Sequence, residues 1–107
     1  MELPTQFSLR QNYPNPFNPT TTIEYTIGGV VALSGAPPSG VEGRASANVK
    51  LVVYDVLGRE VAVLVNERKA AGSYSVTFNA RGLASGVYIY RLTAGSYVQA
   101  RKLLLIR

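Results

Sequence analysis

Three prolines within six residues, Pro14, Pro16 and Pro19, constrain the fold of this chain more than any other feature. A proline lacks an amide donor and pushes the preceding residue, here a Tyr or an Asn, into an extended conformation, so this segment can form neither a helix nor a central strand. The residues that follow, up to Ile27, alternate polar and apolar side chains, which is typical of a strand buried on one face. The sequence therefore predicts a rigid, extended, proline-rich lead-in over residues 1–19 that delivers the chain into a β-sheet.

The composition excludes most catalytic chemistry. The 107 residues contain no cysteine and no histidine, so thiol nucleophiles, thiolate or imidazole metal ligands, disulfides and the commonest general base are all missing. A chain of this length suffices for one domain with one modest hydrophobic core. We therefore expect a single domain over residues 1–107 that is not an enzyme and needs no cofactor.

The net charge of +5 would suit an anionic partner such as nucleic acid, anionic lipid or lipopolysaccharide. The cations are scattered, however, with no run longer than two, and the aromatic motifs of an RNA-recognition sheet are missing. No apolar run approaches the roughly 20 residues of a membrane helix, and the N-terminus lacks the basic and apolar regions of a signal peptide. We expect a soluble chain that does not bind nucleic acid.

Alternating patterns bounded by turn residues predict seven strands. They span residues 7–9, 20–27, 48–56, 60–65, 74–79, 87–93 and 97–105. The third and sixth are apolar on both faces and should lie inside a sheet. A glycine in the Asp55–Arg59 turn predicts that the third and fourth are antiparallel neighbours. Short strands with regular turn signals predict an all-β fold, an immunoglobulin-like sandwich of about seven antiparallel strands in two sheets.

Residues 28–47 do not fit a compact sandwich. The segment is rich in Gly, Pro, Ala and Ser, with Pro37-Pro38-Ser39-Gly40 at its centre, a composition typical of surface loops. Val30-Val31-Ala32-Leu33 could extend a strand or add one, but twenty residues without clear structure are uncommon inside a small domain. We interpret residues 28–47 as an inserted surface loop.

Two kinds of residue could form a site, and both have a simpler structural explanation. Asp55 and Glu60 flank one turn, as a glycosidase pair could, but an Asp at a turn start bonds its own backbone and the Glu is an ordinary surface charge. Six of the seven tyrosines fall in predicted strands, where tyrosine is favoured on structural grounds, so we interpret them as core and cross-strand residues rather than a sugar-binding platform. The acids also lack the spacing of a calcium loop, and no metal site is predicted.

The chain ends in an unusually apolar strand. Residues 101–107 read Arg-Lys-Leu-Leu-Leu-Ile-Arg, and four apolar residues in a row indicate a strand that is buried on both faces or that keeps an apolar patch from water. A chain end is normally loose and polar. We expect this segment to form the last strand of the sandwich. As an edge strand with an unpaired backbone, it could also be the signal that a partner protein recognises by adding a strand to it.

Five blocks of sequence, taken in order, resemble the C-terminal sorting domain of the bacterial type IX (Por) secretion system, type A. They are Gln11 to Tyr25 with its Asn-Pro repeats, Val53 to Val61 around Tyr54-Asp55, the pair Ala71-Gly72, Leu83 to Leu92 around Gly86-Val87-Tyr88, and Lys102-Leu103-Leu104. The resemblance covers nearly the whole chain. Residues 28–47 depart from it, because the family usually has a shorter connection there.

The resemblance implies a non-catalytic signal domain at the end of a larger exported protein. It implies an N-terminally fused cargo, which could be an enzyme such as a glycoside hydrolase or a peptidase, and an outer-membrane translocon that recognises the domain. In many family members a sortase-like peptidase then removes the domain while the cargo is attached to lipopolysaccharide. The implied route passes through the periplasm to the cell surface or the medium.

By position, the resemblance implies that two segments carry the signal for the translocon. Their residues are Gly86, Val87, Tyr88, Arg101, Lys102, Leu103, Leu104, Leu105, Ile106 and Arg107. The Asn-Pro arm and the Asp55–Arg59 turn are expected to be architecture rather than signal.

Two other classes of protein remain open. The immunoglobulin-like domain of flagellar hook-capping proteins shares the Tyr-Asp and Gly-Val-Tyr blocks, but it usually carries a Trp-Asp-Gly element where this chain has Phe78 to Gly82 and no tryptophan. The other class is a carbohydrate-binding or cell-adhesion module appended to a hydrolase, which a glycan-binding screen with Tyr→Ala variants would distinguish.

Overall fold

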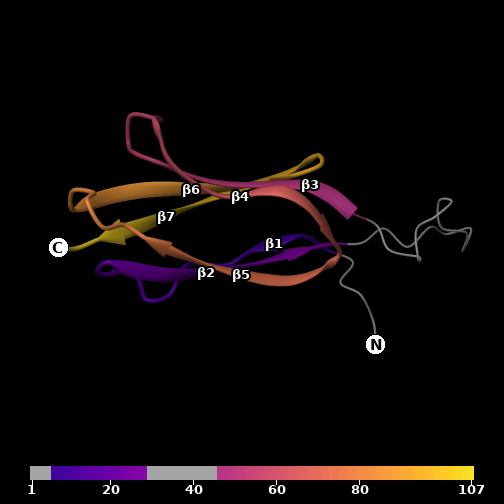
Figure 1. Ribbon diagram of the computed structural model, residues 1–107, viewed down its shortest axis with the longest axis horizontal. Coiled ribbons are helices and arrows are strands. Elements are labelled where there is room, and N and C mark those ends of the chain that lie inside the picture. The colour runs from indigo at the N-terminus through magenta and orange to yellow at the C-terminus, as the bar shows by residue number, and fades with distance from the viewer. Residues whose placement is uncertain (1–5, 29–45) are drawn as a thin grey trace, which may run out of the picture.

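The computed structural model describes residues 6–28 and 46–107. In this part of the chain, seven antiparallel strands form two facing sheets and there is no helix, so none that could span a membrane (Figure 1). One sheet has the order β1-β2-β5, formed by β1 (Ser8–Leu9), β2 (Thr20–Ile27) and β5 (Gly72–Asn79). The other has the order β4-β3-β6-β7, formed by β4 (Glu60–Ala70), β3 (Ser46–Tyr54), β6 (Gly86–Ala94) and β7 (Tyr97–Leu105). The predicted all-β class with two sheets is confirmed.

One hydrophobic core lies between the sheets, built from the inward residues of each strand. Its largest fully buried apolar side chains are Tyr90, Ile23, Ile27, Leu51, Leu92, Leu103, Leu105, Val49 and Val53. Burying one such side chain stabilises the fold by roughly 1.5–3 kcal/mol relative to exposure. Strands β3 and β6 lie in the middle of the four-stranded sheet, as their two apolar faces predicted.

Several strand boundaries differ from the prediction, and the largest difference is at the end of β4. Strand β3 ends at Tyr54, so Val56 belongs to the following turn, and β4 runs on to Ala70 through the polar residues that were expected to end it. Those polar residues still pair with the first half of β3, from Lys50 opposite Asn66 to Ser46 opposite Ala70. They are tolerated because β4 is an edge strand, where exposed charged side chains are common.

Most of the predicted insertion, residues 29–45, lies outside the described residues. Its two ends belong to the sandwich. Gly28 is buried so closely against Gln6 that an added Cβ would lie 2.9 Å from the Gln6 carbonyl carbon. Ala47 lies in β3, opposite Lys69 of β4.

The connections gather at two opposite ends of the sandwich (Figure 1). Gly28, the start of β3 and the β4–β5 corner at Ala71 lie at one end, while the proline-rich arm and the C-terminus lie at the other. We call the latter the distal end, formed by residues 13–19, 55–59, 80–85 and 104–107. Four of the five sequence blocks, separated along the chain, therefore reach the same end of the molecule.

Candidate functional site

The proline-rich arm and the end of β7 bind each other through their backbones. The Phe17 amide donates to the Leu104 carbonyl at 3.0 Å, and the Ile106 amide donates to the Phe17 carbonyl at 3.0 Å. The Asn15 side-chain oxygen accepts from the Leu104 amide at 2.9 Å. We call the contacting residues 11–17 and 102–106 the arm–β7 junction. The expectation of an unpaired terminal edge is wrong here, since the arm satisfies backbone groups that an open edge would leave free.

Two buried polar side chains fold the arm into a loop. The Asn12 amide group donates to Thr21 Oγ1 at 3.0 Å and to the Pro14 carbonyl at 3.2 Å, and Thr21 Oγ1 donates to that carbonyl at 2.8 Å. The backbones of Tyr13 and Thr22 pair through two hydrogen bonds of 2.9 Å. The arm therefore turns back onto β2 where we expected an extended lead-in.

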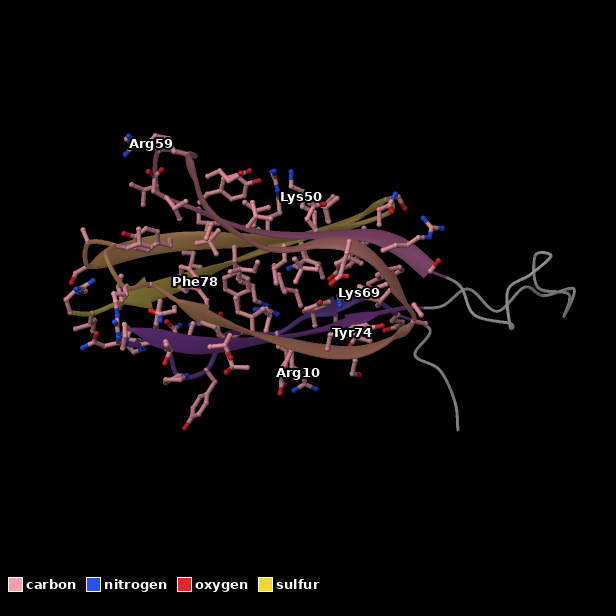
Figure 2. The ribbon with its side chains drawn as sticks, viewed as in Figure 1. Arg10, Lys50, Arg59, Lys69, Tyr74 and Phe78 are labelled. Carbon is pink, nitrogen blue, oxygen red and sulfur yellow. The ribbon has the colours of Figure 1, made fainter. Side chains whose placement is uncertain are left out.

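Tyr90 of β6 anchors the arm to the four-stranded sheet. Its hydroxyl donates to the Arg10 carbonyl at 2.6 Å and accepts from the Asn12 amide at 2.8 Å. Burial raises the pKa of Tyr90, so its hydroxyl stays protonated and keeps donating. Phe17 of the arm enters the core, where its ring lies 6.0 Å from that of Phe78 (Figure 2 labels Phe78 between the sheets).

The two predicted signal segments lie side by side. In the pairing of β6 with β7, Gly86 is opposite Leu105, Val87 is opposite Leu104 and Tyr88 is opposite Leu103. The chain end is also held by the turn before β6, because the Arg107 amide donates to Ser85 Oγ at 2.9 Å and its guanidinium donates to the Leu83 carbonyl at 2.7 Å.

The β3–β4 turn is a rigid projection organised by Asp55. One carboxylate oxygen of Asp55 accepts from the amides of Leu57 and Arg59, each at 2.9 Å, and the other pairs with the Arg59 guanidinium at 2.8 Å. Gly58 takes a φ of +85°, which favours glycine. Val56 and Leu57 at the tip remain 69% and 75% exposed. The turn is ordered by its own hydrogen bonds, without burying its apolar residues.

The hydrogen bonds of Asp55 predict a pH dependence of this turn. The Arg59 amide, and then the Arg59 side chain and the Leu57 amide, lower the pKa of Asp55 from 3.8 against a weaker opposing effect of desolvation. A lowered pKa stabilises the folded turn above pH 3.8, and this contribution is lost as the pH falls through the folded pKa. We expect the Leu57 and Arg59 amide resonances to titrate with a midpoint below 3.8. Asp55→Asn should abolish that titration, and a midpoint above 3.8 would contradict the assignment.

Comparison with known protein families decides what kind of domain this is. The chain matches the family model described as the secretion system C-terminal sorting domain over residues 11–106, nearly its whole length. The chain belongs to this family. Neither a search of curated proteins nor a search of solved structures found a match.

The domain is thus a C-terminal secretion signal of the type IX system, and a sorting signal of this kind is not catalytic. The protein that carries it is exported through the outer membrane. The match favours this reading over the hook-capping and carbohydrate-binding alternatives.

Burial divides the predicted signal residues of the sorting domain into two groups. Tyr88, Leu103 and Leu105 are buried in the core, and the Arg101 guanidinium donates to the Leu9 carbonyl at 2.6 Å, which ties β7 to β1. Gly86 is half-buried. The residues that reach the surface are Val87, Lys102, Leu104, Ile106, Arg107 and also Arg101, whose guanidinium is held by the Leu9 carbonyl. The four apolar residues at the end of β7 therefore alternate between core and surface.

The sequence patterns did not predict that the proline-rich arm lies on the same surface as the exposed residues at the end of β7. Gln11 and Asn15 were assigned to architecture, yet the Gln11 amide group donates to the Lys102 carbonyl at 2.7 Å and Asn15 bonds the next outward-facing residue of β7. The amide side chains along the proline-rich segment could have predicted this contact. Such side chains can form hydrogen bonds with the backbone of a strand edge, whereas a proline has no backbone N–H to donate.

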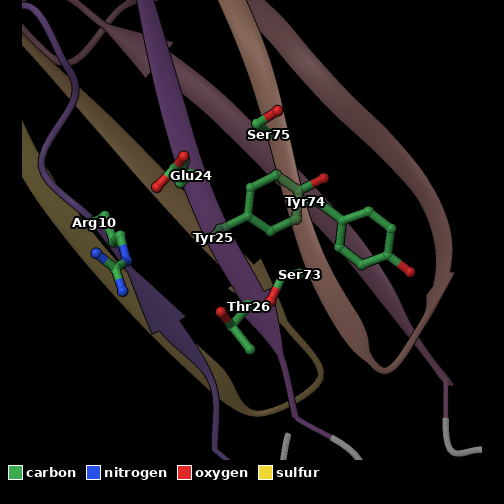
Figure 3. A pocket seen from close by; sticks show the side chains of 7 residues that line it. All are labelled: Arg10, Glu24, Tyr25, Thr26, Ser73, Tyr74 and Ser75. Carbon is green, nitrogen blue, oxygen red and sulfur yellow. The ribbon is translucent and has the colours of Figure 1, made fainter. Parts of the chain in front are cut away.

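The six tyrosines in the strands of the sorting domain are core and cross-strand residues, as predicted. Tyr25 is buried and its ring stacks on that of Tyr74 at 5.5 Å, while the Tyr74 hydroxyl donates to the Ala70 carbonyl at 2.6 Å. Burial, with a smaller effect of Tyr74 and Glu67, raises the pKa of Tyr25 to about 12. Figure 3 shows these rings beside a shallow pocket between β2 and β5, which Arg10 and several short polar side chains also line.

The acids of the sorting domain form no cluster that could hold a metal ion in the part of the chain that the structure describes. Groups of three or more potential metal ligands are missing from residues 6–28 and 46–107. The Asp55 carboxylate, one half of the candidate acid pair, is occupied by its own turn and by Arg59.

Proposed function

We propose that the outer-membrane translocon of the type IX system recognises this sorting domain at the distal end and the adjoining parts of β6 and β7, and that five exposed signal residues there make the contact. These are Val87, Lys102, Leu104, Ile106 and Arg107. The observation that supports this most strongly is the arm–β7 junction, where Phe17 joins Leu104 and Ile106 through backbone hydrogen bonds. It fixes apolar and basic side chains together on a strand end that would otherwise fray.

The other members of the predicted set have a supporting role in this proposal. Tyr88, Leu103 and Leu105 hold β6 and β7 against the core, and Arg101 fastens β7 to β1. Gly86, at a φ of +152° that disfavours other residues, begins the strand that carries Val87. A partner reading the folded domain would contact the exposed side chains and depend on the others for their position.

The distal end suits this role because of where the cargo would join. The chain enters the sandwich at β1, which pairs with the last part of β2, and β2 begins beside the arm and ends at the opposite end of the molecule (Figure 1). An N-terminally fused cargo would thus approach away from the distal end. We further propose the later steps known for many family members: passage from the periplasm to the surface or medium, removal of the domain by a sortase-like peptidase, and attachment of the cargo to lipopolysaccharide.

A pair of surface variants on β7 tests the proposal. Residues 1–107 are fused behind a periplasmic reporter in a host with a working type IX system, and the exported fraction of reporter is measured. Leu104→Asp should lower export at least about tenfold, because a charge replaces an apolar contact. Its matched control is Val98→Asp, an exposed apolar residue on the same face of β7 at the other end of the strand. Val98→Asp should export normally.

The melting temperature of each purified variant separates loss of signal from loss of fold. Both substituted side chains are exposed, at 36% for Leu104 and 56% for Val98, so neither change should unfold the domain. Normal export of a folded Leu104→Asp domain, or an equal loss from both variants, would show that the junction is not what the translocon reads.

A further inference from the structure

We infer that the outer face of the four-stranded sheet carries a docking groove for an extended acidic segment of a partner protein. The groove begins beneath the β3–β4 turn, between Tyr54, Val56 and Arg91. It continues over Ile89 and Ala100 of β6 and β7, which also line the adjoining hollow beside Lys102. This surface goes beyond the junction proposed above, since the two share only Gln11 and Lys102.

Arg91 is held in the groove as a fixed cation. Its guanidinium carbon lies 4.9 Å from the centre of the Tyr54 ring, and one guanidinium nitrogen donates to the Tyr54 hydroxyl at 2.8 Å. No carboxylate in residues 6–28 and 46–107 forms an ion pair with Arg91. A stacked guanidinium with one nitrogen engaged keeps donors for a planar, bidentate anion such as a carboxylate.

The spacing of the two cations in the groove is close to the spacing of alternate side chains along an extended peptide. Arg91 is opposite Ala100 and Ile89 is opposite Lys102, so Arg91 and Lys102 are diagonal neighbours on paired strands, roughly 7–8 Å apart. Side chains two residues apart on a strand are separated by roughly 6.6 Å. Two carboxylates at alternate positions of a bound strand can therefore reach both cations.

The acids near the groove do not neutralise it. Asp55 is committed to the turn and to Arg59, and Glu60 is opposite Tyr54 on the edge strand β4, on the side of Tyr54 away from β6. Lys50 adds a further cation on this side of the molecule, where Figure 2 shows it together with Arg59. Charge complementarity thus favours an acidic partner.

The turn supplies an apolar contact next to these cations. Val56 and Leu57 bury little within the domain, yet the Asp55 hydrogen bonds hold their backbone in place. A pre-organised apolar pair loses little conformational entropy when a partner covers it. A flat lipid surface would reach the projecting tip without filling the hollow over Ile89 and Ala100, so the shape favours a peptide segment over a membrane.

Peptide titration of the whole chain tests the inference. A short peptide alternating glutamate with valine is added to the labelled protein, and amide chemical shifts are followed. We expect shifts at residues 54–59, 89–91 and 100–102, which line the groove. Arg91→Glu should weaken binding at least about tenfold, equivalent to about 1.4 kcal/mol. Leu57→Ser, which keeps the backbone bonds of the turn, should weaken it less.

Arg10→Glu is the matched control, since it makes the same charge change on the opposite side of the molecule (Figure 2), and it should bind the peptide like the unaltered chain. The inference is overturned if Arg10→Glu and Arg91→Glu weaken binding equally, or if a peptide with lysine in place of glutamate binds as well. It is also overturned if phosphatidylglycerol vesicles, and not the peptide, shift these amides. The titration uses no translocon, so a failed export test of Leu104 leaves its result unaffected.

Discussion

Replacing Phe17 with alanine should lower the free energy of unfolding by about 3–5 kcal/mol, the usual cost of deleting a buried phenylalanine ring. Phe17 is 2% exposed and packs on Phe78 at the distal end of the core. Its backbone also carries both backbone-to-backbone hydrogen bonds that join the arm to the end of β7. Loss of the ring should therefore loosen the arm as well as empty part of the core. The measurements are chemical denaturation for the free energy and hydrogen exchange of the Ile106 amide for the junction.

The control for Phe17 comes from the same arm. Tyr13 is 80% exposed, so Tyr13→Ala removes an aromatic ring of similar size from water rather than from the core. We expect that variant to change the free energy of unfolding by no more than about 0.5 kcal/mol. If Phe17→Ala left the exchange of Ile106 unchanged relative to Tyr13→Ala, the arm would not be what protects the end of β7.

The second large effect is a contrast between two adjacent leucines at the end of β7. Leu103 is 1% exposed, so Leu103→Ala should cost about 2–5 kcal/mol of stability through lost burial and a cavity. Leu104 is 36% exposed, and Leu104→Ala should cost no more than about 0.5 kcal/mol. Thermal or chemical denaturation of the two variants measures the difference. Equal losses would mean that the alternation of burial along β7 is wrong.

This contrast also bears on how the signal should be tested. Deleting residues 103–107 would remove Leu103 and Leu105 from the core together with the exposed side chains, so failed export would not distinguish a lost address from a lost fold. Single changes at exposed positions, such as Leu104→Asp, avoid that ambiguity because they leave the buried half of the strand in place.

Local sequence patterns predicted a large part of the fold. The alternation from Thr20 to Ile27 gave the bounds of β2 correctly, and the two apolar faces of β3 placed it inside its sheet. The Asp-x-x-Gly turn predicted the β3–β4 pairing. These features were readable because side-chain alternation, turn chemistry and glycine conformations depend on residues close together in the chain.

The errors arose where the deciding contact was distant in sequence. The pattern of β4 became polar after Val65, but the strand continued because β3 offered further backbone partners. The exposed part of the signal could not be separated from the core part either, since Leu103-Leu104-Leu105-Ile106 reads as one apolar run. Which of these residues faces the core depends on the position of the opposite sheet.

The proline-rich segment likewise has some features that depend on local sequence and others that depend on distant contacts. By itself the sequence determined that residues 14–19 could be neither helix nor central strand, and that a half-buried strand follows them. Only the tertiary structure decided that this arm folds back and covers the end of β7, through a hydrogen bond between Asn15 and Leu104 that spans 89 residues of sequence. The reason is physical: proline restricts its own backbone locally, whereas the partner of a strand edge is chosen by the packing of the two sheets.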